Sequence, residues 1–313
     1  MRISRRDLLH KITKGGAAVA VGSAVTPAML SGVAHAEETA KVLPDALGML
    51  YDATLCIGCQ TCVVACTKAN HLSPDNRRDG LHQEPGDLNY RTKTLIKLYK
   101  SEDGKELSFV KQQCMHCVDP ACVAACMFGG LKKDTTTGVV SWNGRLCVGC
   151  RYCEVACPYN IPKFRWEGFN PEIVKCELCR ERLAEGKEPG CTTVCPRKAV
   201  IFGKREDLLL QAKQRIAQSP GKYYEDRVFG EKEGGGTQVL YLSHVAFEKL
   251  GLPKLGDESI PGKYLKWQKK LYAYLIFPMG LYAVLAGTIS KNWKTHEEHM
   301  EHEEKATGMR AQL

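Results

Sequence analysis

The chain has 313 residues, of which 44% are hydrophobic, a size and composition typical of one or two folded domains. Its formal net charge is +9, but residues 1–36 carry five positive charges and one negative charge, which leaves +5 on the remainder. No aromatic-and-basic pattern typical of RNA binding occurs, so this charge does not indicate a nucleic-acid partner.

Residues 1–36 are predicted to be a twin-arginine signal peptide. Arg5 and Arg6 are adjacent, residues 15–33 form an apolar run rich in small side chains, and residues 34–36 read Ala-His-Ala, an A-x-A cleavage site. An ordinary secretory signal or an uncleaved helix is the alternative. The paired arginines and the modest hydrophobicity of the apolar run favour twin-arginine export, and therefore a periplasmic protein.

All sixteen cysteines fall into four runs of four. The first and third runs have the spacing C-x2-C-x2-C-x3-C, whereas the middle gap holds four residues in the second run and eleven in the fourth. In two-cluster ferredoxins such a run gives three cysteines to one [4Fe–4S] cluster and the fourth to the other cluster. The runs are Cys56, Cys59, Cys62 and Cys66; Cys114, Cys117, Cys122 and Cys126; Cys147, Cys150, Cys153 and Cys157; and Cys176, Cys179, Cys191 and Cys195.

Zinc sites and disulfides are the other common uses of cysteine. Structural zinc sites usually combine two C-x2-C pairs and have no need for a further cysteine displaced by three residues. Disulfides form in oxidising compartments, but no cysteine is left over here, and twin-arginine export carries folded proteins. We therefore expect iron–sulfur clusters that are loaded in the cytoplasm. With about −2 for each of four clusters and its thiolates, the loaded mature protein has a net charge near −3.

Short strands are predicted between the cysteine runs. Residues 70–90 are polar and rich in turn-forming residues, which predicts an exposed loop. Alternating apolar and polar residues predict small strands, with the cysteine runs in the loops and short helices between them. The predicted strands are residues 92–99, 107–110, 138–142, 199–202 and 237–242. This pattern predicts an α+β fold of duplicated ferredoxin-like modules, each for two clusters, over residues 37–255.

Residues 271–290 are predicted to form a transmembrane helix after a linker at residues 256–270. The segment has no charged residue, and at about 1.5 Å per residue a helix of this length spans the roughly 30 Å hydrocarbon layer. Trp267 and Trp293 bracket it, as expected at the two membrane interfaces. A buried core helix is the alternative. Export of the upstream domain places it on the periplasmic side of the inner membrane and the polar tail, residues 291–313, in the cytoplasm.

The sequence lacks the motifs that mark a catalytic centre. It has no haem-attachment motif, metalloprotease helix, nucleotide fingerprint or nucleophile elbow, so no catalytic residue is predicted. Iron–sulfur clusters carry one electron at a time, and the protein sets their spacing and potentials. The pattern therefore indicates an electron-transfer subunit that is not an enzyme on its own and acts within an oxidoreductase complex.

The layout of the four runs resembles the family of iron–sulfur beta subunits that serve membrane-bound formate dehydrogenases, dimethyl sulfoxide reductases and nitrite reductases. Within this family, the sequence is most similar to the iron–sulfur electron-transfer subunits of the hydrogenase-2 type. The resemblance covers nearly the whole chain and is carried by residues 48–52, 111–120, 230–240 and 252–255. Met127 departs from it, because proline follows the last cysteine of this run in the hydrogenase relatives.

The resemblance implies that each cluster takes three cysteines from one run and a fourth from another. The first cluster would bind Cys56, Cys59, Cys62 and Cys195, and the second would bind Cys66, Cys176, Cys179 and Cys191. The third would bind Cys114, Cys117, Cys122 and Cys157, and the fourth would bind Cys126, Cys147, Cys150 and Cys153. All four sets are complete, so four [4Fe–4S] clusters and no three-iron cluster are implied.

The resemblance also implies a role in anaerobic respiration. Electrons from a nickel–iron uptake hydrogenase would pass from its small subunit through these clusters to an integral membrane subunit that reduces quinone. A beta subunit of a molybdopterin oxidoreductase, of the formate dehydrogenase or nitrite/DMSO reductase type, is the alternative within the class. An enzyme that itself reduces a soluble substrate and a zinc-bound scaffold are alternatives outside it.

Overall fold

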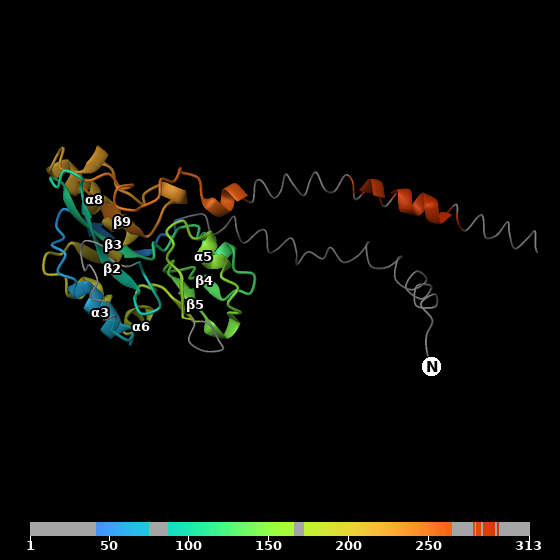
Figure 1. Ribbon diagram of the computed structural model, residues 1–313, viewed down its shortest axis with the longest axis horizontal. Helices are drawn as coiled ribbons and strands as arrows, with labels where there is room; N and C mark the ends of the chain where they lie inside the picture. Colours follow the sequence, from blue (N-terminus) through green and yellow to red (C-terminus); the bar gives the residue numbers. More distant parts are fainter. Residues whose placement is uncertain are drawn as a thin grey trace, which may run out of the picture. The chain divides into compact units, whose positions relative to one another are not determined.

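The computed structural model describes residues 42–74, 87–165 and 172–264, together with positions 278–293 except 279, 283 and 292. The predicted signal peptide and the tail beyond residue 293 lie outside the described residues. The chain divides into two units, Met1–Gly262 and Lys263–Leu313. The first unit contains all sixteen cysteines and is a mixture of short helices and small sheets (Figure 1).

A three-stranded sheet forms the centre of the first unit. Its middle strand, β1 (Leu47–Asp52), pairs antiparallel with β8 (Val200–Lys204) and parallel with β9 (Val239–Leu242). Every residue of β9 is buried, as are five of the six residues of β1. Strands buried on both faces are rich in apolar residues without a strict alternation, and this explains why β1 is not predicted from alternation.

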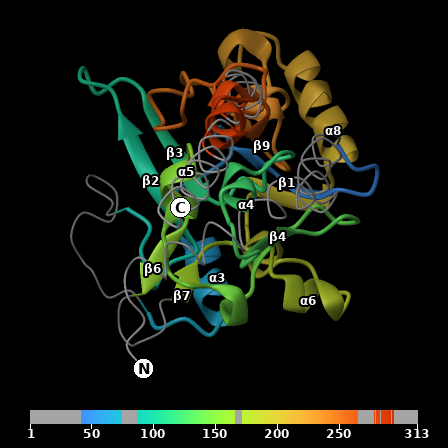
Figure 2. The same ribbon diagram turned by 90° about the vertical axis from the view of Figure 1, so that its right-hand side faces the viewer.

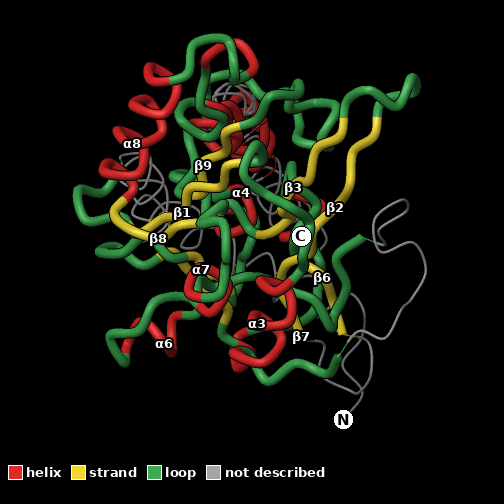
Figure 3. Tube along the Cα trace, turned by 90° about the vertical axis from the view of Figure 1, so that its left-hand side faces the viewer, coloured by secondary structure: helices red, strands yellow, loops and turns green. Residues whose placement is uncertain are grey.

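The two faces of this sheet pack against different parts of the unit. Leu50, Leu240 and Leu242 share one hydrophobic cluster with Leu208 and Ala212 of helix α8 (Arg205–Gln218), which covers that face (Figure 3). On the opposite face, residues that alternate with these along β1 and β9 share a larger cluster with buried cysteines. That set comprises Met49, Tyr51, Val239, Tyr241, Cys62, Cys114, Cys176 and Cys191. The sheet therefore separates α8 from the cysteines.

The other described strands form three antiparallel hairpins. The long one joins β2 (Thr94–Lys100) to β3 (Leu107–Gln113), and the short ones join β4 (Leu131–Lys133) to β5 (Val140–Trp142) and β6 (Lys163–Arg165) to β7 (Glu172–Val174). The predictions of strands at β2, β3, β5, β8 and β9 are confirmed, whereas β1, β4, β6, β7 and α8 were not predicted. β4, β6 and β7 have only three residues each, too few to show a period.

The short helices bring distant cysteine runs together in pairs. Helix α3 (Thr61–Ala69) packs against α7 (Gly190–Thr193), as Figure 3 shows, so the first run meets the fourth. Helix α4 (Ala121–Ala124) packs against α5 (Tyr152–Ala156), as Figure 2 shows, so the second run meets the third. Helix α6 (Arg180–Ala184) follows the second cysteine of the fourth run, and η1 (Gly144–Leu146), η2 (Tyr224–Asp226) and η3 (Glu233–Gly235) are single 3-10 turns.

The second unit is described only in part. Residues 278, 280–282, 284–291 and 293 are helical, and their large apolar side chains, such as Leu281 and Val284, are exposed. Within the described residues, no helix combines the length and the apolar character needed to cross a membrane. The predicted transmembrane segment, residues 271–290, lies partly outside the described residues.

Candidate metal centres

All sixteen cysteines lie in described residues and are free thiols. The fold gathers them into four groups, here called sites 1 to 4. These groups are the four sets that the resemblance implies, each with a fourth cysteine from another run. Iron ligation by them stays a prediction, and the geometry of each site decides how well it fits a cluster.

Site 1 consists of Cys56, Cys59, Cys62 and Cys195, which line one cavity between the start of α3 and the loop after α7. Two backbone N–H groups donate to sulfur: Gly58 to Cys56 Sγ at 3.5 Å and Ala199 to Cys195 Sγ at 3.2 Å. Such bonds stabilise negative charge on sulfur and so favour thiolate over thiol.

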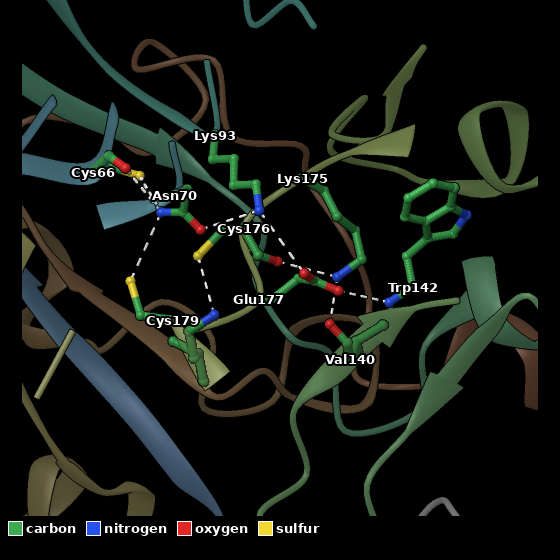
Figure 4. Close-up of polar contacts among 10 residues, drawn as sticks. Cys66, Asn70, Lys93, Val140, Trp142, Lys175, Cys176, Glu177 and Cys179 are labelled. Carbon is green, nitrogen blue, oxygen red and sulfur yellow. Dashed lines mark hydrogen bonds and ion pairs between the residues drawn. The ribbon is translucent and has the colours of Figure 1, made fainter. Parts of the chain in front are cut away.

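Site 2 consists of Cys66, Cys176, Cys179 and Cys191, which line a second cavity. The Asn70 amide lies between two of these sulfurs, with its Nδ2 3.6 Å from Cys66 Sγ and 3.9 Å from Cys179 Sγ (Figure 4). Lys93 Nζ in turn donates to Asn70 Oδ1 at 3.1 Å, which fixes the orientation of the amide. Asn70 is therefore a hydrogen-bond donor to site 2 that the cysteine spacing does not predict.

Site 3 consists of Cys114, Cys117, Cys122 and Cys157, from the second and third runs. Burial raises the pKa of Cys117 well above its usual value, and the charges of the other three cysteines raise it further. Burial also raises the pKa of Cys122, and the charge of Cys114 raises it further. Four thiols that influence one another in this way share one small volume, and none of them is exposed.

Site 4 consists of Cys126, Cys147, Cys150 and Cys153, which line a third cavity beside α5. The N–H of Leu131 donates to Cys126 Sγ at 3.4 Å. Burial raises the pKa of Cys153 to about 12, and its three partner cysteines, Cys126 first, add to the rise. Without metal the buried Cys153 thiol holds its proton at neutral pH, so metal binding has to release it.

The same backbone turn recurs at sites 1 and 4. Gly58 and Gly149, each just before the second cysteine of its run, have φ of +70° and +71°, and Gln60 and Arg151 have φ of +58° and +63°. The left-handed residue caps the helix that carries the third cysteine. A side chain at Gly58 has no room, because a Cβ there would lie 2.3 Å from the Phe109 ring. The repeated turn supports a duplicated module.

The sites adjoin one another in the order 1, 2, 3, 4. Burial raises the pKa of Cys62 to about 11, and Cys191 of site 2 is among the charges that act on it. Burial likewise raises the pKa of Cys176 to about 12, with a further rise from Cys114 of site 3. Cys153 of site 4 acts in the same way on Cys122 of site 3. Only Cys59 of site 1 and Cys150 of site 4 are exposed thiols, so the two end sites reach the surface.

The donor set fits iron–sulfur clusters. Each site offers four sulfurs around a cavity or a shared buried volume, and N–H groups point at the sulfurs at sites 1, 2 and 4. Glu177 also lines the site 2 cavity, where its carboxylate pairs with Lys93 Nζ at 3.8 Å. Among the described residues, no three His, Cys, Asp or Glu side chains converge closely enough to hold a single metal ion.

His116, in the second run, is fully buried. Its Nδ1 accepts a hydrogen bond from the N–H of Val140 at 3.0 Å. Burial lowers its pKa well below the usual value, and Lys175 and Lys133 lower it further, so the ring is neutral.

Comparison with known proteins identifies an iron–sulfur domain in this chain. The profile of the 4Fe-4S dicluster domain matches residues 105–205. The chain is 39% identical to the hydrogenase-2 operon protein HybA of Escherichia coli O157:H7, over 91% of this chain and 97% of that protein. It is 34% identical to the iron–sulfur subunit of the nitrate-inducible formate dehydrogenase of E. coli K12, over 77% and 82% of the two chains. The formate dehydrogenase-O iron–sulfur subunit of the same strain is 32% identical, over 85% and 91%.

Proposed function

This chain belongs to the family of iron–sulfur electron-transfer subunits that includes HybA and the formate dehydrogenase iron–sulfur subunits, and we propose that it conducts electrons between a catalytic and a membrane partner through four [4Fe–4S] clusters. When bound, each cluster accepts and releases one electron. The chain's own residues hold the clusters, set their order and control their exposure. Sites 1 to 4 are the proposed ligand sets, with four thiols each.

The observation that carries this proposal is the single row of four sites with an exposed thiol at each end. Apolar side chains surround both ends: Ile57 at site 1 is 55% exposed, and Phe128 and Val148 at site 4 are 51% and 57% exposed. Apolar side chains are typical of the buried centre of protein interfaces. Sites 1 and 4 are therefore the proposed points at which electrons enter and leave.

The ligand sets are tested with Cys195→Ser. Because Cys195 lines site 1 although its neighbours in sequence serve site 2, the change is expected to damage the site 1 cluster and leave the site 2 cluster intact. Iron analysis and electron paramagnetic resonance of anaerobically purified protein measure this, with Cys191→Ser as the matched variant that damages site 2. Loss of the same cluster in both variants contradicts the assignment, and zinc in place of iron contradicts the proposed function.

The proposed donor is the small subunit of a nickel–iron uptake hydrogenase, and the proposed acceptor is an integral membrane subunit that reduces quinone. HybA, with 39% identity and nearly full coverage, supports the hydrogenase. The formate dehydrogenase relatives support the second candidate, a beta subunit of a molybdopterin oxidoreductase. In membranes from the native host, hydrogen is expected to reduce the clusters and formate is not. Reduction of the clusters by formate but not by hydrogen would contradict the hydrogenase and favour a molybdopterin oxidoreductase as the donor.

We further propose that the protein is exported by the twin-arginine pathway and anchored by residues 271–290, on the periplasmic side of the inner membrane. The paired arginines and the uncharged segment support these two proposals. A chain that ends at residue 262 is expected to leave the membrane fraction when the membrane partner is absent. Retention of that chain in the membrane contradicts the anchor.

A further inference from the structure

Lys111 of β3 is a buried cation that lies between sites 1 and 2. Its side chain is 1% exposed and lines both the site 1 and the site 2 cavities. The β2–β3 hairpin therefore carries one ammonium group to the junction of the first two cysteine groups.

The hydrogen-bond partners of this ammonium are neutral. Lys111 Nζ donates to Thr94 Oγ1 at 2.7 Å and to Gln113 Oε1. Gln113 in turn donates to Met49 Sδ at 3.3 Å, so the acceptors are held by the sheet and not by a carboxylate. A buried charge without an opposite charge is strongly unfavourable. The Glu177 carboxylate, which also lines the site 2 cavity, pairs with Lys93 at 3.8 Å, so the cysteine sulfurs are the negative groups that balance Lys111.

Lys111 and the cysteines of both sites shift one another's pKa values. Burial by itself lowers the pKa of Lys111, but the charges of Cys191, Cys62 and Cys176 outweigh it and raise the pKa above its usual value. Conversely, burial raises the pKa values of Cys62, Cys66, Cys176 and Cys191, and in each case Lys111 lowers them. Cys62 belongs to site 1 and the other three to site 2, so one charge acts on both sites.

We propose that Lys111 is the shared counter-charge of sites 1 and 2, a positioning residue that raises the reduction potentials of both clusters together. This inference rests on the proposed function. Reduction adds one electron and one negative charge to a site, and a fixed positive charge nearby in a low dielectric stabilises the reduced form more than the oxidised form. The Lys111 proton stays on Nζ throughout. Because the same charge serves both sites, it shifts both reduction potentials in the same direction and changes the difference between them little.

The test is a redox titration of holoprotein, followed by electron paramagnetic resonance, with sites 1 and 2 identified through Cys195→Ser and Cys191→Ser. In Lys111→Met, the ratio of reduced to oxidised cluster at a fixed potential is expected to fall about tenfold at sites 1 and 2, which is about 59 mV for a one-electron couple. Sites 3 and 4 are expected to change less than threefold. Lys105→Met removes an exposed lysine from the turn of the same hairpin and is the matched control, with no change at any site.

The outcomes separate this inference from the function on which it rests. Wild-type protein without iron rejects the proposed function. Fully loaded Lys111→Met with unchanged potentials, with only one site shifted, or with all four shifted equally, overturns the shared counter-charge. If Lys111→Met does not fold, Lys111→Gln keeps a hydrogen-bond donor without the charge and is titrated in its place. Collapse of both uncharged variants overturns the redox role in favour of a structural one.

Discussion

Asn70, just after α3, places its side-chain amide against two sulfurs of site 2. Its Nδ2 group is within 3.6 Å of Cys66 Sγ and 3.9 Å of Cys179 Sγ, and it also donates to the Cys66 carbonyl at 2.8 Å. Hydrogen bonds to cluster sulfurs stabilise the more negative, reduced state. Asn70 would therefore raise the electron affinity of a cluster bound at site 2.

Asn70→Leu is expected to lower the reduction potential of the site 2 cluster. The loss of about 1 kcal/mol of hydrogen bonding to sulfur corresponds to a shift between about 30 and 60 mV for a one-electron couple. Potentiometric titration measures it, with Gln214→Leu on the exposed side of α8 as the control. A shift at site 4 in place of site 2, or an equal shift in both variants, contradicts the prediction.

At this scale, the cysteines could be predicted and their polar neighbours could not. Sulfur ligands have to follow a fixed spacing, which the sequence displays. Asn70 and Lys111 act through space, and their roles depend on the folded positions of α3 and β3. Lys111 comes directly after the predicted strand at residues 107–110, where a lysine is expected to face solvent, yet both Val110 and Lys111 are buried in β3. Nothing in the sequence distinguishes such a lysine from an exposed one.

Helix α8 stabilises the sheet on the side opposite the cysteines. Leu208 and Ala212 pack against Leu50, Leu240 and Leu242, whereas Leu210 is 59% exposed on the outer side of the same helix. Arg205 at the start of α8 donates from Nε to the Thr237 carbonyl at 2.7 Å and joins the helix to the segment before β9. These contacts attach α8 to β1 and β9, on the face of the sheet opposite the cysteine sites.

Leu208→Ala is expected to destabilise the protein by about 2–5 kcal/mol, because it removes a buried side chain and leaves a cavity. Leu210→Ala is the matched control on the same helix, with an expected effect within about 0.5 kcal/mol. Urea denaturation of the holoprotein under anaerobic conditions measures both. Equal destabilisation by the two variants contradicts the packing described for α8.

Helix α8 could have been found from the sequence, whereas β1 could not. Leu208, Ala212 and Ile216 recur every four residues, and Glu206 and Asp207 lie in the first turn, which are ordinary signals of an amphipathic helix. β1 is buried on both faces, so its sequence lacks alternation. Its partners, β8 and β9, lie more than 140 residues further along the chain, so no local pattern in the sequence reveals the pairing.

At the scale of the whole molecule, export and cluster loading are coupled if the twin-arginine prediction holds. Replacement of Arg5 and Arg6 with lysine is expected to leave folded, cluster-containing protein in the cytoplasm, because this pathway requires both the arginine pair and a folded cargo. Cell fractionation with iron analysis of the purified protein measures it. Undiminished export of the variant contradicts the prediction, and an apoprotein in the cytoplasm contradicts loading before export.

The row of sites also predicts an order in which the clusters are lost. Cys59 and Cys150 are exposed, whereas three of the four cysteines of site 2 are buried and no cysteine of site 3 is exposed. Oxidants and chelators reach exposed sulfurs first, because thiolate reactivity depends on access. Mild ferricyanide treatment with a chelator is therefore expected to remove the iron of sites 1 and 4 before that of sites 2 and 3, in two phases of about equal size, since two of four equal clusters go first.

Alkylation followed by peptide mass spectrometry identifies the cysteines released in each phase. Labelling in the first phase is expected at the cysteines of sites 1 and 4, including Cys195, which is far from the other site 1 cysteines in sequence but lines the same cavity. Protein unfolded beforehand is the control, in which all sixteen cysteines are labelled at similar rates. Early labelling of Cys66 or Cys176 would show that site 2 is open to solvent, and the row would then not have two exposed ends and a buried middle.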